Sequence, residues 1–234
     1  MGQHRWLGEN HRRFSIPPER SVMSRISVFL SALVICHCLI TNPIRATEKE
    51  HLRRLGGSDK WTPEELAMYL PPACRVKEDK TAHDERKMWE NTLGVAFLHL
   101  HHYCTGLTFL SRVERGIGDR NYLLNAALKE FRYMQRIPQD NALRPELEYN
   151  TGYVLFQLKR YPEALGSLQK TVLLKPDYVQ AYLLLSSCYG RIGNATRAAE
   201  ILRAGLARMP ESAALKDALS AITTTESKSG QSRN

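Results

Sequence analysis

A repeat of 34 residues constrains the fold of this chain more than any other feature. The first copy covers residues 145–178 and the second covers residues 179–212. Like residues recur 34 positions apart in three pairs: Ala164 and Ala198, Leu168 and Leu202, Pro176 and Pro210. A fixed period of this length indicates stacked structural units, because one such unit cannot bury its apolar face alone.

Each copy combines small and large residues in the way that two crossing helices require. Four positions are small where the helices would come close: Gly152, Ala164, Ser186 and Ala198. Larger side chains are placed to fill the space between the helices: Leu155, Leu168, Tyr182, Tyr189 and Leu202. A proline closes each copy, and proline does not continue a helix. Each copy is therefore predicted to be a helix–turn–helix unit.

The two copies resemble tetratricopeptide repeats, a family of 34-residue helix pairs with the pattern W-x2-L-G-x2-Y, then A-x3-F, then P. Gly152 takes the glycine position of the first copy, and Ala164 and Pro176 take the later marks. The first helix departs from the pattern, because Glu148 stands at the usual Trp position and Thr151 at the usual Leu position. The resemblance implies an all-α fold of antiparallel helix pairs stacked as an α-solenoid.

The flanking residues are expected to complete this stack, since two repeats are too few to stand alone. Residues 61–144 are interpreted as one divergent helical unit and residues 213–222 as a C-terminal capping helix. The polar residues 223–234 are predicted to be a disordered tail.

Within the divergent unit, the segment Thr62-Pro63-Glu64-Glu65 predicts a helix start, and Pro71-Pro72 predicts its end. Cys74 would lie just beyond this helix, and residues 76–83 are predicted to be a loop or a frayed helix. Apolar spacing predicts one long helix over residues 84–110 and a second over residues 121–137. The likeness to a repeat rests on four residues: Ala127 and Phe131 match a second helix, and Trp89 and Gly94 lie near the pattern of a first helix.

The N-terminal residues are interpreted as a targeting segment. Residues 26–40 are mostly apolar, Arg20 and Arg25 precede them, and Ala46 is the expected cleavage site. The predicted leader therefore covers residues 1–46, with Met23 as an alternative start, and residues 47–60 form a linker. An uncleaved membrane anchor is the alternative, although a spanning helix needs about 20 apolar residues. Export to the periplasm or cell envelope is the expected location.

The resemblance also implies a groove lined by the first helix of each repeat. In the first copy its residues would be Glu146, Tyr149, Tyr153, Phe156 and Gln157. In the second copy they would be Gln180, Leu183, Ser187, Gly190 and Arg191. The alternative is that Tyr149, Tyr153 and Phe156 pack on the divergent unit, because a short array leaves little free groove.

A histidine-rich turn, residues 99–104, is not explained by repeat packing. Its candidate metal ligands are His99, His101, His102 and Cys104, with Cys74 and His83 as further ligands. Packed or surface histidines are one alternative, and a disulfide between Cys74 and Cys104 is another. Cys188 is expected to be a small buried residue.

The remaining sequence indicates a binding role rather than catalysis. It contains no nucleophile–His–Asp order, HExxH, P-loop or dinucleotide fingerprint, so no enzyme activity and no cofactor are predicted. The net charge of +9 is scattered, which argues against nucleic-acid binding. The predicted function is an exported scaffold that binds a partner protein or peptide. The alternative is a metal- or haem-binding envelope protein that uses residues 99–104.

Overall fold

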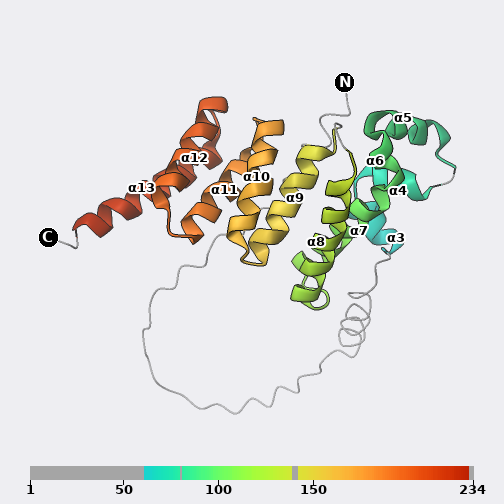
Figure 1. Cartoon of the computed structure of the whole chain (residues 1–234), viewed down its shortest axis with the longest axis horizontal. Helices are drawn as coiled ribbons and strands as arrows, with labels where there is room; N and C mark the ends of the chain where they lie inside the picture. The colour runs from blue at the N-terminus through green and yellow to red at the C-terminus, as the bar shows by residue number, and fades with distance from the viewer. Residues whose placement is uncertain (1–60, 80, 139–141, 232–234) are drawn as a thin grey trace, which may run out of the picture. The chain divides into compact units, whose positions relative to one another are not determined.

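The computed structural model describes residues 61–79, 81–138 and 142–231, with side chains up to residue 224. These residues belong to one compact unit, residues 50–234. The predicted leader, linker and cleavage site lie outside the described residues. The described part contains eleven helices, α3 to α13, and no strand (Figure 1). The all-α prediction is therefore confirmed.

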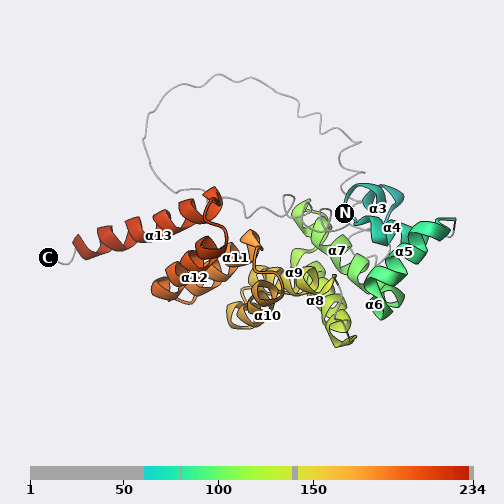
Figure 2. The same cartoon turned by 90° about the horizontal axis from the view of Figure 1, so that it is seen from above.

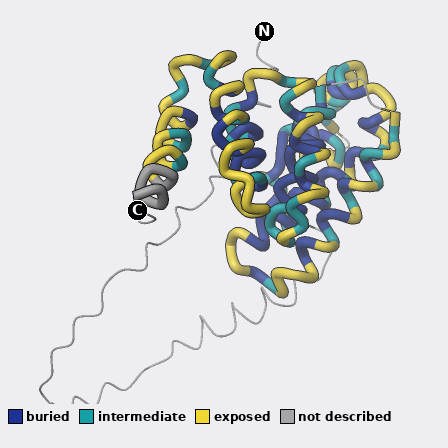
Figure 3. The backbone as a smooth tube through the Cα atoms, turned by 60° about the vertical axis from the view of Figure 1, so that its left-hand side comes forward, coloured by how far each residue is buried: buried dark blue, intermediate teal, exposed yellow. Residues whose placement is uncertain are grey.

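The two predicted copies each form one helix pair. The first pair is α9 (Arg144–Gln157) and α10 (Tyr161–Leu174), and the second is α11 (Val179–Arg191) and α12 (Ala195–Arg208). Each of these helices packs on the one before and the one after it. Seen from above, α8 to α12 follow one another in a row (Figure 2). Buried residues gather where the helices face one another, and exposed residues gather at the turns (Figure 3).

A third helix pair precedes these two, and it is formed by α7 (Leu100–Glu114) and α8 (Arg120–Arg136). The small residue at their crossing is Gly106, which lies against the ring of Phe131. Ala127 and Phe131 are both fully buried in α8, as predicted for a second helix. The match of Gly94 to the first-helix pattern was wrong, because Gly106 takes that place twelve residues later.

The single long helix predicted for residues 84–110 is also wrong. The structure has α5 (His83–Leu93), the short α6 (Val95–Leu98) and then α7. The chain breaks at Gly94, which has φ 54° and ψ −135°, a conformation that only glycine adopts readily. A second break lies at His99, with φ −98° and ψ 4°. Apolar spacing did not reveal the breaks, because Leu93, Phe97 and Leu100 are buried on both sides of them.

The first described helix, α3 (Pro63–Met68), begins as predicted. Thr62 and Glu65 form a capping box, in which each side chain bonds the backbone N–H of the other residue. Residues 76–78, predicted as loop or frayed helix, belong together with Cys74 to a new helix, α4 (Pro72–Glu78), which Pro72 starts. Proline is favourable at this first position, where its missing N–H costs no hydrogen bond.

The C-terminal helix α13 (Ala213–Gln231) packs on the last repeat through Leu215, which is buried with Tyr182 and Leu202. It runs nine residues past the predicted end at Ile222, into the predicted disordered tail. No proline interrupts residues 213–231, so nothing stops the helix early. Exposed polar side chains along it suit a capping helix: Lys216, Asp217, Ser220 and Thr223.

Candidate partner-binding surface

The predicted groove residues of the second copy lie on α11. Gln180, Leu183 and Ser187 are half-buried, and Gly190 and Arg191 are exposed. Their spacing of three and four residues puts the first three on one face of the helix. A side chain built at Gly190 would meet no atom within 4 Å of its Cβ. This face is therefore small and polar, with open space at its C-terminal end.

The predicted groove residues of the first copy lie on α9 and are less accessible. Glu146, Tyr149 and Tyr153 are buried, whereas Phe156 and Gln157 are half-buried. The hydroxyl of Tyr153 donates a hydrogen bond of 2.9 Å to Glu114 at the end of α7. That contact agrees with packing on the divergent unit for Tyr153, and the groove assignment stays a prediction.

Aromatic rings connect α9 to the turn between α10 and α11. The ring of Tyr149 stacks on Tyr178, with centroids 4.9 Å apart, and lies 6.4 Å from Tyr153. Lys175 lies 5.0 Å above the Tyr178 ring, and its Nζ is 3.1 Å from Glu146. Burial raises the pKa of both Tyr149 and Tyr153, so these hydroxyls stay protonated.

Contacts at the C-terminal end of α9 are more polar. Arg120 donates a hydrogen bond of 2.6 Å to Gln157, and the ring of Phe156 lies 5.4 Å from that of Tyr161. Burial raises the pKa of Glu114, and the hydrogen bond from Tyr153 opposes that rise.

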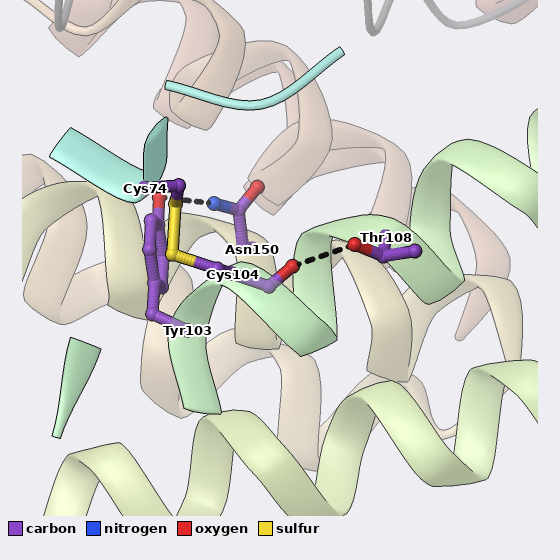
Figure 4. Close-up of a disulfide and its surroundings, with 5 residues drawn as sticks. All are labelled: Cys74, Tyr103, Cys104, Thr108 and Asn150. Atoms are coloured by element: carbon purple, nitrogen blue, oxygen red, sulfur yellow. Dashed lines mark hydrogen bonds between the residues drawn. A yellow bond between two sulfur atoms is a disulfide. The ribbon is translucent and has the colours of Figure 1, made fainter. Parts of the chain in front are cut away.

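Cys74 and Cys104 are joined by a disulfide that links α4 to α7 (Figure 4). Their Cα atoms are 5.8 Å apart, and both residues are fully buried. Asn150 of α9 donates a hydrogen bond of 3.0 Å to the hydroxyl of Tyr103, next to this bridge. The bridge therefore lies where the N-terminal helices, the divergent pair and the first repeat come together.

The histidines of the turn bond to α8 rather than to one another. Nδ1 of His102 lies 2.6 Å from Glu130, and Nδ1 of His99 lies 3.1 Å from the hydroxyl of Tyr133. His101 is exposed, but partial desolvation of its ring together with the nearby charges of His102 and Lys77 lowers its pKa.

The structure does not bring the candidate metal ligands together. Within residues 61–79, 81–138 and 142–231, no group of three or more His, Cys, Asp or Glu side chains is placed to hold a metal ion. Cys74 and Cys104 are used by the disulfide. His99 and His102 bond to side chains of α8, and His101 is exposed, with its ring centroid 4.1 Å from that of His102. The described geometry therefore gives the metal-binding alternative no ligand set.

A buried ion pair between α3 and α7 was not predicted from the sequence. Arg112 donates two hydrogen bonds to Glu65, from Nε to Oε1 at 2.8 Å and from Nη2 to Oε2 at 2.7 Å. Arg112 is fully buried and Glu65 is 5% exposed. Glu65 was part of the predicted helix start, but Arg112 lies between the two helices predicted over residues 84–110 and 121–137.

Cys188 is buried in α11, as expected, and burial raises its pKa to about 12. That thiol therefore stays protonated and unreactive near neutral pH.

Among the residues that the structure describes, no helix is long and apolar enough to cross a membrane.

Comparison with known proteins supports the repeat assignment over part of the chain. Residues 155–222 match the family model described as tetratricopeptide repeat. A stretch of 70 residues is 37% identical to the Hsp70-Hsp90 organizing protein of Triticum aestivum, and covers 30% of this chain and 12% of that protein. A solved structure titled "Crystal structure of MamA" has 15% identity and a TM-score of 0.47, and covers 68% of this chain and 87% of that one. Residues 155–222 are therefore similar to tetratricopeptide repeats.

Proposed function

We propose that this chain is an exported, non-catalytic scaffold that binds a partner protein or peptide along the first helices of its repeats. The observation that carries the proposal is the accessible face of α11 within the matched segment, residues 155–222. Tetratricopeptide repeats are helix-pair arrays, and such arrays present extended concave surfaces for binding. The name of the Triticum aestivum relative, an organizing protein for Hsp70 and Hsp90, also points to protein partners.

The chemistry of this face favours an extended peptide over a deeply inserted side chain. Gln180 and Ser187 offer polar groups, and Gly190 leaves room for a backbone to approach the helix closely. Arg191 adds a positive charge at the end of the face. In the first repeat, Phe156 and Gln157 of α9 are half-buried and are the more accessible of the predicted groove residues.

Export is proposed from the leader and from cysteine usage. Residues 20–46 have the basic, apolar and small-residue parts of a secretory signal, with cleavage after Ala46. The bond between Cys74 and Cys104 suits an oxidising compartment, since thiols stay reduced in the cytosol. We propose a role in the envelope of a bacterial cell, with an uncleaved membrane anchor as the alternative. N-terminal sequencing of the mature protein tests this, and Thr47 is the expected first residue.

Partner capture with two matched glycine variants tests the binding face. Gly190 in α11 and Gly166 in α10 both lie within helices, and a β-carbon added at either position would meet no atom within 4 Å. Gly190→Arg places a long charged side chain on the proposed binding face, and Gly166→Arg places it on a second helix. Both proteins are used as bait against envelope extracts, and bound proteins are identified by mass spectrometry.

Gly190→Arg should lose partners that wild type and Gly166→Arg retain. Circular dichroism must show that both variants keep the helical content of wild type. Equal recovery of the same partners by both variants would contradict binding at α11.

A further inference from the structure

We propose that α3 and α4, residues 63–78, form a redox-gated cap on α7. A thiol reductant reaches the disulfide only when this α3–α4 cap opens, and the ion pair between Glu65 and Arg112 controls the opening. The proposal needs the oxidised protein but no partner, so its test is separate from that of the scaffold function.

The disulfide cannot be reduced while the cap is closed. Reduction requires a thiolate to approach one sulfur of the bond directly, so the rate depends on access. Cys74 and Cys104 both have 0% exposure. Reduction therefore has to follow a local opening that brings one of these residues to the surface.

The ion pair is a further attachment of the cap, beside the disulfide and the hydrogen bonds from Arg86 of α5 to the carbonyls of Val76 and Lys77, and it opposes that opening. Glu65 and Arg112 make two short charge-assisted hydrogen bonds across the interface between α3 and α7. Arg115 adds a cation–π contact, with its guanidinium 4.6 Å from the centroid of the Tyr69 ring. Opening separates these groups, so weakening the ion pair raises the population of the open form.

The cap occupies a face of α7 that is distinct from the face used by α8. Its contacts fall on Cys104, Arg112 and Arg115, which recur at helical spacing. Gly106 instead meets Phe131 of α8. The cap can therefore leave α7 while the helix pairs from α7 to α12 remain packed.

The redox step transfers two electrons from a dithiol reductant to the cystine. One thiolate of the reductant attacks a cystine sulfur, forms a mixed disulfide and releases the other cysteine as a thiolate. The second thiol of the reductant then displaces the remaining cysteine. The reductant ends as a disulfide, and Cys74 and Cys104 end as thiols after taking up two protons.

The test measures the rate at which dithiothreitol reduces the folded full chain. Samples are quenched with an alkylating reagent, and the labelled peptide that contains Cys74 is followed by mass spectrometry. Glu65→Gln removes the charge of the ion pair but keeps an acceptor for the capping box. Glu64→Gln, at the exposed neighbouring position, is the matched control.

We expect Glu65→Gln to be reduced at least about tenfold faster than wild type, because loss of one partner of a buried pair favours the open form. Glu64→Gln should match wild type. A milder variant, Tyr69→Leu, removes the ring below Arg115 and should accelerate reduction by a smaller factor, which keeps the test valid if Glu65→Gln folds poorly.

Hydrogen exchange after reduction provides a second readout. The amides of α3 and α4 should lose protection while those of α9 to α12 keep it. Equal reduction rates in all three variants and wild type, loss of protection throughout the array, or free Cys74 and Cys104 in the oxidised protein would each overturn the proposal.

Discussion

Gly152 of α9 crosses α10 directly above Leu168, so closely that a β-carbon on residue 152 would lie 2.6 Å from the leucine Cγ. The same β-carbon would lie 2.8 Å from Cδ2 of Leu168 and 3.4 Å from the carbonyl oxygen of Ala164. Leu168 is fully buried and cannot move aside freely. This crossing fixes the distance between the two helices of the first repeat.

Gly152→Ala should therefore destabilise the protein despite the higher helix propensity of alanine. Overpacking of this kind costs about 1–3 kcal/mol. The free energy of unfolding, measured by urea titration with circular dichroism, checks the value. Gly166→Ala in α10 is the control, because its β-carbon meets no atom within 4 Å, and it should gain about 0.5–1 kcal/mol. A stabilising Gly152→Ala would show that the helices are not held at this distance.

Lys159 has a left-handed backbone, with φ 61°, at the turn between α9 and α10. The equivalent residue 34 positions later is Gly193, with φ 81°. A left-handed backbone costs a non-glycine residue about 1–2 kcal/mol. Glycine avoids this cost, but it also raises the conformational entropy of the unfolded chain, which offsets part of the stabilisation. Lys159→Gly should therefore raise the free energy of unfolding by about 0.5–1 kcal/mol. Gly193→Ala should lower the free energy of unfolding by about 1 kcal/mol. Urea titrations of both variants and wild type check whether the two changes have opposite signs.

Glu148 is a buried carboxylate at the position where the repeat pattern has tryptophan. Its Oε1 lies 2.8 Å from Nη2 of Arg144, and its Oε2 accepts a hydrogen bond of 2.6 Å from Gln135. The contact with Arg144 is short but lacks the alignment of a hydrogen bond, since Oε1 has no such partner. The guanidinium of Arg144 and the carboxylate of Glu148 are thus close together but are not aligned for a hydrogen bond.

Glu148→Ala should lower the free energy of unfolding by about 2 kcal/mol, because Gln135 and Arg144 lose their partner. The double variant Arg144→Met, Glu148→Leu should recover most of this loss, since apolar residues of similar volume often replace a buried pair without cost. A double-mutant cycle with the single variants Arg144→Met and Glu148→Leu measures the coupling. Strictly additive single and double variants would contradict an interaction between the two side chains.

The repeats from α9 to α12 could be predicted because their constraints are local and periodic. Gly152, Ala164 and Leu168 are fixed by the crossing of adjacent helices, so the same residue types return after 34 positions. Gly106 obeys the same constraint in the divergent pair. It was missed because Trp89 and Gly94 gave a competing match at the wrong place.

Contacts between distant parts of the chain could not be predicted in the same way. Glu65 and Arg112 are 47 residues apart, and no sequence pattern near either residue identifies the other as its partner. The groove positions follow from the repeat pattern, but their accessibility does not. Tyr149 is buried whereas its equivalent Leu183 is half-buried, and that difference depends on what surrounds each repeat.

The stability of the α3–α4 cap should fall in acid through Glu65. Burial of Glu65 opposes its ionisation, but the hydrogen bonds from Arg112 and from the backbone of Thr62 outweigh this effect. They hold its pKa below the ordinary value of 4.5. A carboxyl whose pKa is lower in the folded state contributes stability above its unfolded pKa and loses it as the pH falls through the folded pKa. The cap of wild type should therefore be more stable than that of Glu65→Gln near pH 6, and this difference in stability should disappear as the pH drops to about 3.

Hydrogen exchange of the α3 amides at several pH values isolates this effect from the other carboxyl groups, because the variant shares all of them. Burial raises the pKa of Glu114, so that group acts in the opposite direction and stabilises the fold more in acid. The difference between wild type and Glu65→Gln removes the contribution of Glu114. A difference that stays constant across this pH range would mean that Glu65 does not ionise differently in the folded and unfolded protein. The ion pair with Arg112 would then contribute no charge-dependent stability to the cap.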